Sequence, residues 1–295
     1  MISICIPVFN YDIRQLVEGI IIEKKSLNTP LEIICIDDCS SAPFLKLNQS
    51  VEKKEDVQFI SLEENIGRSK IRNLFIKYAK YENLIFIDCD CSINQKGFIS
   101  NYIENINHEV VYGGRKHHEN RPKDKSTILR WKYGKKKEDL DLSTRRKSPY
   151  VSFRSNNFLI KRSILNKIRF NEKFSSYGHE DTQLAYDLKE NKVEIIHIDN
   201  PVFHEGLENN KDFISKTEIG IKNLIQLKLK SNELAEIKLL TYYEKAKRLK
   251  INTLLLKISP LFISLFRIQL ESRYPSLIIF NIYKLLFLLR IKNNV

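Results

Sequence analysis

The sequence has few of the residues that mark fibrous, low-complexity or disulfide-stapled proteins. Its 295 residues include only nine Gly and eight Pro and show no repeat period, which excludes collagen-like, linker-like and solenoid architectures. Its five cysteines are odd in number and are not spaced like a usual zinc site, and Met1–Phe9 lacks the basic start and the cleavage site of a signal peptide. We therefore expect a cytoplasmic protein whose cysteines stay reduced.

Acidic residues are in deficit, and the deficit is uneven along the chain. The sequence holds 49 Lys+Arg against 36 Asp+Glu, a formal net charge of +13, yet residues 1–110 carry more acidic than basic side chains. Residues 115–169 alone contain 18 basic and 5 acidic residues. Such a block is typical of surfaces that bind polyanions, anionic lipid or phosphate groups, and it also occurs in loops that only keep a protein soluble.

The first 114 residues alternate between short apolar, β-branched runs and helical patterns. Near-continuous apolar runs such as Ile2–Pro7 and Leu31–Ile36 are typical of strands buried on both faces of a parallel sheet. Repeated strand–helix–strand units predict an α/β fold with a doubly wound, mostly parallel sheet flanked by helices. Further strands are predicted at Val57–Ile60, Leu84–Ile87, Val110–Tyr112 and Val193–Ile198, and helices at 11–26, 66–80, 94–107, 163–167 and 177–190.

The basic segment 115–149 interrupts this alternation. Its weak apolar pattern predicts a long, mobile active-site loop with little regular structure of its own. Trp131 and Tyr133 stand among cations within it, an arrangement that suits closure over a sugar or a diphosphate. Both are candidates for contact with a substrate that accepts a transferred group. The alternative is that the segment is a flexible surface loop.

Acidic side chains follow two of the predicted strands, at the point where each strand ends. Asp37-Asp38 ends one strand, and Asp88-Cys89-Asp90 ends another. Two carboxylates two residues apart suit one Mg²⁺ or Mn²⁺ ion, and they also occur as caps of a following helix. Glu180-Asp181 opens a predicted helix, where its dipole favours a carboxylate in any case, and His204 follows a strand as structural histidines often do.

Five segments, in this order along the chain, resemble the inverting family 2 glycosyltransferases of the GT-A fold. Together they cover about residues 1–207, and this part is expected to be the catalytic domain. They are Ile4–Asn10 with a Pro-x-aromatic-Asn turn, Ile36–Ser40 with Cys39 where the family has Gly in Asp-Asp-Gly-Ser, Asn65–Asn73, Phe86–Asp90 with Asp-x-Asp, and Tyr177–Asp181 with Gly-x-Glu-Asp.

The resemblance implies a nucleotide pocket at the end of the first strands. Pro7, Phe9 and Asn10 would form a turn that packs around the nucleotide base, and Asp38 would contact the base. Arg72 matches the Arg of the third segment and is a lesser candidate for the same pocket.

The resemblance also implies the chemistry. Asp88 would lie near the ribose and the metal, Asp90 would ligate Mn²⁺ or Mg²⁺, and His204 matches a position at which several members place a further metal ligand. Asp181 matches the catalytic base, and its neighbour Glu180 is a candidate for contact with the acceptor. A sugar would pass from a nucleoside diphosphate, a UDP-sugar foremost, to a hydroxyl of a glycan or a lipid-linked saccharide, as in cell-surface polysaccharide biosynthesis of bacteria.

Residues 208–295 are predicted to form a basic, helical C-terminal extension. Its two apolar runs, Leu254–Phe266 and Leu277–Leu289, are shorter than the roughly 20 residues that a membrane-spanning helix needs. Apolar helices with basic flanks indicate peripheral attachment at the inner face of the plasma membrane. The alternatives are packing on the catalytic domain or a dimer interface.

Three other classes of protein share parts of this pattern. A non-catalytic protein that binds polyanions or membranes on a GT-A-like fold would explain the charge but not the acidic turns. A nicotinamide-dependent oxidoreductase would need Gly-x-Gly-x-x-Gly after the first strand, where Pro7-Val8-Phe9-Asn10 stands. A nucleotidyltransferase would need a Gly-rich basic signature at that place. No nucleic acid partner is expected.

Overall fold

The computed structural model describes residues 1–174, 177–227, 229–234 and 236–293. They form two units, the first made of Met1–His118, Asp139–Ser175 and Glu180–Gly206, and the second of Glu119–Glu138, Ser176–His179 and Leu207–Val295. A boundary between the units falls one residue before the expected one at 207/208. The expected catalytic domain included the whole basic segment 115–149. In the structure, residues 119–138 of that segment belong to the second unit, with the C-terminal helices.

A seven-stranded sheet forms the centre of the first unit. Strand β1 lies between two parallel neighbours, and its Ile4 stands opposite Ile33 on one side and Ile85 on the other. Only β8 runs antiparallel to its neighbours, so the prediction of a mostly parallel sheet is confirmed. The order is β3 (Val57–Ser61), β2 (Leu31–Asp37), β1 (Ile2–Val8), β4 (Asn83–Ile87), β8 (Asn157–Lys161), β6 (Val110–Tyr112) and β9 (Ile195–His197).

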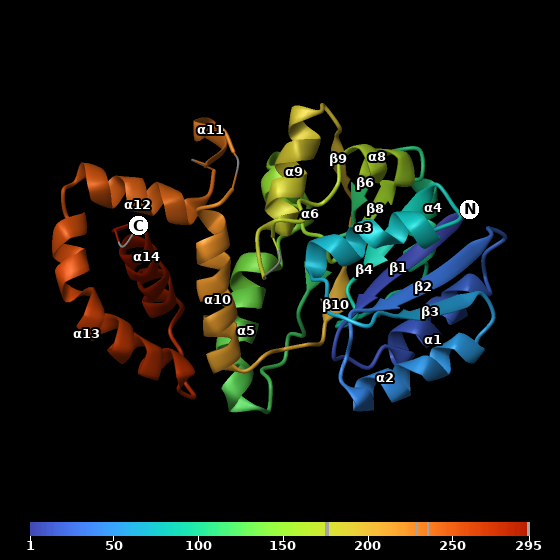
Figure 1. Ribbon diagram of the computed structural model, residues 1–295, viewed down its shortest axis with the longest axis horizontal. Helices are drawn as coiled ribbons and strands as arrows, with labels where there is room; N and C mark the ends of the chain where they lie inside the picture. Colours follow the sequence, from blue (N-terminus) through green and yellow to red (C-terminus); the bar gives the residue numbers. More distant parts are fainter. Residues whose placement is uncertain (175–176, 228, 235, 294–295) are drawn as a thin grey trace. The chain divides into compact units, whose positions relative to one another are not determined.

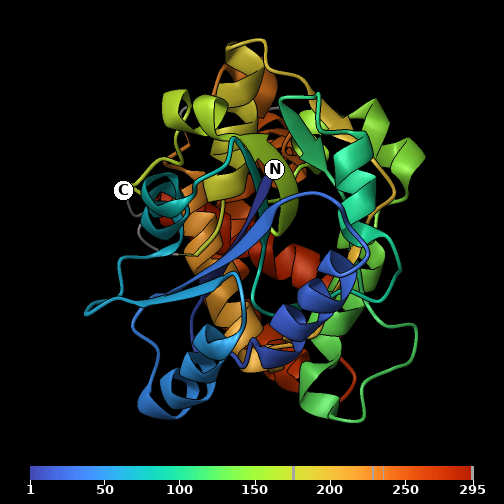
Figure 2. The same cartoon turned by 90° about the vertical axis from the view of Figure 1, so that its right-hand side faces the viewer.

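Helices cover both faces of this sheet, because the strand side chains alternate between two apolar clusters. One cluster joins even-numbered β1 residues such as Ile4 to α1 (Arg14–Lys24) and α4 (Phe98–Glu104). The other joins Cys5 and Phe86 to three helices on the opposite face. Figures 1 and 2 show α1 and the unpredicted helix α2 (Ala42–Asn48) on the same side of the blue strands. The helices of the second cluster are α3 (Arg68–Tyr78), α8 (Arg162–Lys167) and α9 (Glu180–Glu190).

A second sheet of three very short strands lies in the same unit. Its order is β5 (Cys91–Ser92), β10 (Val202–His204) and β7 (Arg115–Lys116), and none of the three strands was predicted. The register places His204 opposite Cys91. This pairing brings His204, which is far away in the sequence, next to the turn that follows β4.

The expectation that residues 115–149 have little regular structure is wrong. Asp124 and Asp141 begin helices there by accepting the backbone N–H groups of Ser126 and Thr144, each at 2.8 Å. The high charge of the segment favoured a reading as a loop, and these caps were not recognised in the sequence. Two of its cations are buried rather than solvated: Arg130 pairs with carboxylates, and Arg145 stacks on a tyrosine. The segment contains η2 (Lys125–Thr127), α5 (Ile128–Tyr133), the π-helix η3 (Gly134–Glu138), α6 (Leu142–Lys147) and α7 (Pro149–Ser152), which extends to 152.

The second unit is helical, as predicted for the C-terminal region. Its core joins Leu129 of α5 to Phe213 and Ile214 of α10, Leu270 of α13, and Phe280 and Tyr283 of α14. The helices beyond residue 206 are α10 (Asn210–Leu224), α11 (Ser231–Leu234), α12 (Lys238–Arg248), α13 (Asn252–Glu271) and α14 (Leu277–Asn293).

Helix α13 is longer than its apolar run indicated. It continues through Pro260 for 20 residues, so by length and composition alone it could cross a membrane, whereas its apolar run Leu254–Phe266 is too short to do so. Proline has no N–H for the carbonyl of Leu256 one turn earlier, and the hydroxyl of Ser259 donates to that oxygen at 2.8 Å instead. This substitute bond explains how the helix passes a proline, and Figure 1 shows its ribbon bending along the way.

The buried His197 of β9 is expected to make the protein less stable in mild acid. Burial first, and then the charge of Arg145, lower its pKa from 6.5 to about 4. Nε2 lies 3.0 Å from the Pro149 carbonyl oxygen and Nδ1 lies 3.4 Å from Nη1 of Arg145, so a proton on Nδ1 would face a cation. Since the unfolded chain takes up this proton first, stability should fall by up to roughly 3 kcal/mol as the pH drops from about 6.5 to about 4.

Urea unfolding at a series of pH values between 7 and 4 measures this loss. In His197→Gln, which has no titrating ring, the part of the loss that belongs to this site should disappear. The same pH dependence in both proteins would contradict the assignment.

Candidate active site

The turns after β1 and β2 are tied to each other. The backbone N–H of Asn10 donates to Ser40 Oγ at 2.8 Å, and Asn10 Oδ1 accepts the N–H of Ser41 at 2.8 Å. Asn10 and Cys39 both adopt a left-handed φ, of 49° and 61°. Cys39 thus takes a backbone conformation that Gly, the usual residue of the family here, takes without strain. Phe9 is half exposed at this edge and Pro7 is partly buried.

Asp38 holds the loop that precedes α3. Its carboxylate accepts the backbone N–H groups of Ile66 at 2.7 Å and of Gly67 at 3.0 Å, and its carbonyl oxygen accepts Asn65 Nδ2 at 2.9 Å. Burial raises the pKa of Asp38, and these two N–H bonds act against that rise. Gly67 has a φ of 84°, a conformation that suits only glycine well, so the loop can present its N–H here. Asp38 therefore connects the end of β2 to the start of α3.

Asp88 is bound by Arg72. Arg72 Nη2 lies 2.6 Å from Asp88 Oδ1, Nη1 donates to the Arg68 carbonyl oxygen at 3.1 Å, and the guanidinium lies over the ring of Phe170. Arg72 is almost fully buried, and only part of Asp88 reaches solvent. The contact fixes the orientation of Asp88 at the end of β4. Arg72 therefore positions Asp88.

Asp90 and His204 face each other across the small sheet. His204 Nε2 lies 3.3 Å from Asp90 Oδ2, and its other ring nitrogen, Nδ1, is buried with no hydrogen-bond partner among the described residues. Burial alone would raise the pKa of Asp90, but His204, and after it Arg68 and Arg115, hold it well below its ordinary value. The backbone of Gly206 passes so close that a Cβ there would lie 2.7 Å from Asp90 Cβ. The geometry keeps this carboxylate ionised beside an imidazole nitrogen.

These side chains fit a divalent cation that is also bound by a diphosphate. Asp90 and His204 offer one carboxylate oxygen and one ring nitrogen at the same place, whereas Asp88 is turned to Arg72. Among the residues that the structure describes, no group of three or more His, Cys, Asp and Glu side chains forms a complete metal cage. Mg²⁺ and Mn²⁺ sites that share their ion with phosphate oxygens need only one or two protein ligands.

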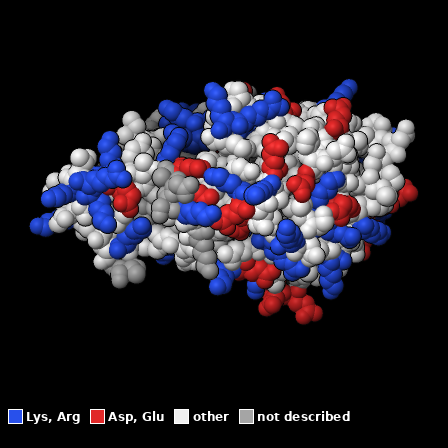
Figure 3. Space-filling model, turned by 90° about the horizontal axis from the view of Figure 1, so that it is seen from above, with Lys and Arg blue, Asp and Glu red and all other residues white. Residues whose placement is uncertain are grey.

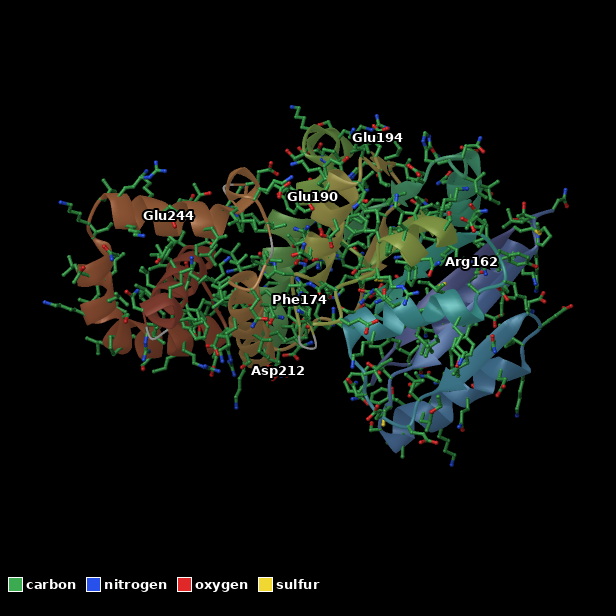
Figure 4. The ribbon with its side chains drawn as sticks, turned by 45° about the horizontal axis from the view of Figure 1, so that its top comes forward. Arg162, Phe174, Glu190, Glu194, Asp212 and Glu244 are labelled. Atoms are coloured by element: carbon green, nitrogen blue, oxygen red, sulfur yellow. The ribbon has the colours of Figure 1, made fainter. Side chains whose placement is uncertain are left out.

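Glu180 and Asp181 lie at the first turn of α9, at the opposite end from Glu190, which Figure 4 labels. Asp181 Oδ1 accepts the N–H of Thr182 at 2.7 Å, and Oδ2 lies 3.8 Å from Arg154 Nε. Glu180 is buried and lies 3.7 Å from Arg68 Nη1, and its burial raises its pKa. Asp181 keeps part of its surface in solvent, so of the two carboxylates it is the more accessible to a substrate.

Several residues of this site were not predicted. Arg68 pairs with Glu180 and also lowers the pKa of Asp90, so it links the start of α9 electrostatically to the Asp-x-Asp turn. Its position four residues before Arg72 places both on one face of α3, a signal that the sequence contained. Arg154 follows the basic segment with no motif around it. Tyr11 lies in the field of Asp90, and burial followed by that charge raises the pKa of Tyr11 to about 12.

Trp131 and Tyr133 lie on α5 of the second unit. The ring of Tyr133 packs against Phe213 and Phe280, with centroids 5.4 and 5.7 Å apart, and Lys284 lies over it. Tyr133 thus contributes to the helical core. Contact of either aromatic side chain with an acceptor stays a prediction.

Comparison with known proteins shows the family to which the chain belongs. The sequence profile of Glycosyl transferase family 2 matches residues 3–169. Chondroitin synthase of Pasteurella multocida is 27% identical over an alignment of 223 positions, which covers 63% of this chain and 23% of that protein. The poly(ribitol-phosphate) beta-N-acetylglucosaminyltransferase TarS of Staphylococcus aureus is 29% identical over 97 residues, 32% of this chain and 17% of its own length. The chain therefore spans less than a quarter of these curated relatives.

Solved structures share the fold. S. aureus TarS 1–349 in complex with UDP-GlcNAc has a TM-score of 0.52 at 18% identity and covers 99% of this chain and 90% of its own. The mannosyltransferase PcManGT from Pyrobaculum calidifontis, in complex with GDP-Man and Mn²⁺, has a TM-score of 0.54 at 14% identity and covers 76% and 63%. With the family match over more than half of the sequence, the chain belongs to glycosyl transferase family 2 and has the GT-A fold of glycosyltransferases, followed by a helical C-terminal region.

Proposed function

We propose that this protein is an inverting glycosyltransferase that moves a sugar from a nucleoside diphosphate to a hydroxyl group by a single, metal-assisted displacement. The observation that carries the proposal is the pairing of Asp90 with His204, 3.3 Å apart, beside an Asp88 that Arg72 fixes at 2.6 Å. Asp88 and Asp90 follow the carboxyl end of β4, which is parallel to β1, and α/β sheets bind their ligands at such ends.

The donor is proposed to be a UDP-sugar. The tied turns of Asn10 and Ser40, together with the half-exposed Phe9, provide one wall for a planar base. Asp38 can still accept a hydrogen bond from the base or the ribose, since each carboxylate oxygen has a second acceptor position. The complex of S. aureus TarS 1–349 with UDP-GlcNAc supports a uridine donor.

The leaving diphosphate gains negative charge as its bond to the sugar breaks. Mn²⁺ or Mg²⁺, held by Asp90 and His204 with Asp88 nearby, would supply Lewis-acid stabilisation of that charge. Arg68 and Arg115, whose charges already act on Asp90, add fixed positive charge at the same place. The neighbour PcManGT in complex with Mn²⁺ supports manganese as the metal.

Asp181 is proposed to be the catalytic base. The acceptor hydroxyl is a weak nucleophile, so its proton must pass to a carboxylate as its oxygen attacks the anomeric carbon. The oxygen–carbon bond forms on one face while the bond to the diphosphate breaks on the other, and the nucleoside diphosphate leaves with the electron pair. This displacement inverts the anomeric configuration. Arg154 Nε lies 3.8 Å from Asp181 Oδ2, so a cation stands beside the proposed base.

The acceptor is proposed to be a glycan or a lipid-linked saccharide at the inner face of the plasma membrane, in cell-surface polysaccharide biosynthesis. The chondroitin synthase relative and the poly(ribitol-phosphate) acceptor named for TarS support a polymeric acceptor. Glu180 and Trp131 remain candidates for acceptor contact.

Thermal unfolding with nucleotides tests the donor site. UDP with Mn²⁺ at about 100 times its dissociation constant should stabilise the protein by roughly 2.7 kcal/mol, and UDP without metal should do less. GDP, dTDP and CDP, each with and without Mn²⁺, are the matched comparisons. If no nucleotide shifts the transition, the result favours a second candidate function. The protein would then be a polyanion- or membrane-binding protein on this fold, a function that the net charge of +13 favours.

A further inference from the structure

Helix α13 has an apolar stripe that the described residues leave largely exposed. Its members recur every three or four residues and therefore lie on one side of the helix. Their exposed fractions run from 36% to 71%, high for large apolar side chains that lie side by side. The stripe consists of Leu254, Ile258, Leu261, Phe262, Leu265 and Ile268.

The opposite side of α13 packs into its own unit. Leu270 is fully buried there, with Ile263 and Phe266 packed against the same cluster. Arg267 lies 3.2 Å from Glu218 of α10 and 3.0 Å from Glu271. A helix that crossed a bilayer would have to leave this core and bring Arg267 into lipid, which is expensive. The helix therefore offers one face to an apolar partner while the other stays in protein.

The surroundings of the stripe are positively charged. No Asp or Glu occurs between Glu244 and Glu271, whereas the same stretch contains six Lys and Arg. Five of these are exposed: Lys245, Lys247, Arg248, Lys250 and Lys257. Figure 4 labels Glu244 on α12, and Figure 3 shows how basic side chains gather on the part of the surface around that helix. A second copy of the chain would oppose this charge with its own, whereas anionic lipid head groups complement it.

We propose that the α13 stripe docks this protein on an anionic membrane, with the helix lying in the plane of the interface. Apolar side chains enter the boundary between head groups and acyl chains, and the lysines at the end of α12 contact the head groups. The inference does not rest on the proposed transfer, since binding to lipid needs neither donor nor metal.

Flotation with lipid vesicles tests the proposal on the full chain. The wild type should float with vesicles of phosphatidylcholine and phosphatidylglycerol, and much less with phosphatidylcholine alone. Leu261→Glu with Leu265→Glu should weaken binding on the order of tenfold or more. Ile22→Glu with Leu47→Glu, a matched pair of exposed apolar positions in the first unit, should leave it unchanged.

Two further variants and measurements keep the test decisive. Lys247→Gln with Lys250→Gln should weaken binding to anionic vesicles roughly fivefold for each lysine, and added salt should do the same. Wild type that fails to float with anionic vesicles, or a stripe variant that floats as well as wild type, overturns the proposal. So does retention of the chain in membranes after alkaline carbonate, which indicates a crossing helix. A dimer in solution that the stripe variant dissociates, without vesicle binding, would assign the stripe to a second copy instead.

Discussion

Asp181→Asn is expected to lower the rate of sugar transfer by about 10²- to 10⁴-fold while UDP binding stays within twofold of wild type. Asn keeps the size of the side chain and the oxygen that accepts the Thr182 N–H at 2.7 Å, so the start of α9 should persist. It removes the negative charge and the ability to take a proton from the acceptor hydroxyl. The loss should therefore appear in kcat rather than in the affinity for the donor.

The matched control is Asp187→Asn on the same helix. Asp187 accepts Gln183 Nε2 at 2.8 Å, and its replacement by Asn takes the same charge from α9 while leaving Asp181 unchanged. Steady-state transfer with an oligosaccharide acceptor, alongside UDP titration by calorimetry, measures both quantities. Unchanged turnover in Asp181→Asn would mean that this carboxylate has no role as a base and is only a helix-terminal group favoured by the helix dipole.

The sheet and the location of the site could be predicted because burial on both faces leaves a strong trace in sequence. Strands such as Ile2–Val8 and Leu31–Asp37 are nearly continuous apolar runs, and polar turns follow them at their carboxyl ends. The turns of Asp38 and Asp90 therefore had to fall at one edge of the sheet. What the side chains do there follows from contacts that are distant in sequence, such as Arg72 with Asp88.

The small sheet could not be predicted, because strands of two or three residues show no periodicity. Yet its register alone places His204 opposite Cys91 and hence beside Asp90. The resemblance to a family supplied the role of His204, and the pairing of β5 with β10 supplies the reason for its position. A residue 114 positions away from its partner needed this pairing to reach it.

The basic segment was misjudged for a different reason. Arg130 and Arg145 count as solvated charge in a composition, but both are buried in the structure. Arg130 lies 2.9 Å from Glu138 and 3.2 Å from Glu208, and Arg145 donates to backbone carbonyls near Gly113. Net charge by segment therefore overstated the surface available to polyanions, because paired cations contribute to packing instead.

Asp90→Asn is expected to remove the dependence of UDP binding on Mn²⁺. In wild type the metal should tighten UDP binding, because the ion joins the diphosphate to Asp90 and His204, which lie 3.3 Å apart. Asn retains the shape of the side chain and an oxygen toward His204 but loses the charge that binds the ion. UDP affinity in the presence of Mn²⁺ should fall about 10- to 100-fold, to the level measured without metal.

The Asn variant separates metal binding from folding. Gly206 packs directly against Asp90, so a residue of equal size preserves that contact, whereas Asp90→Ala would also open a gap. Glu190→Ala at the far end of α9 is the control for loss of an acidic group, and it should keep the full response to Mn²⁺ (Figure 4). Titration of UDP by calorimetry, with and without Mn²⁺, for wild type and both variants gives the affinities needed. A metal response that survives in Asp90→Asn would mean that the ion is bound elsewhere, and it would leave Asp90 only its pairing with His204.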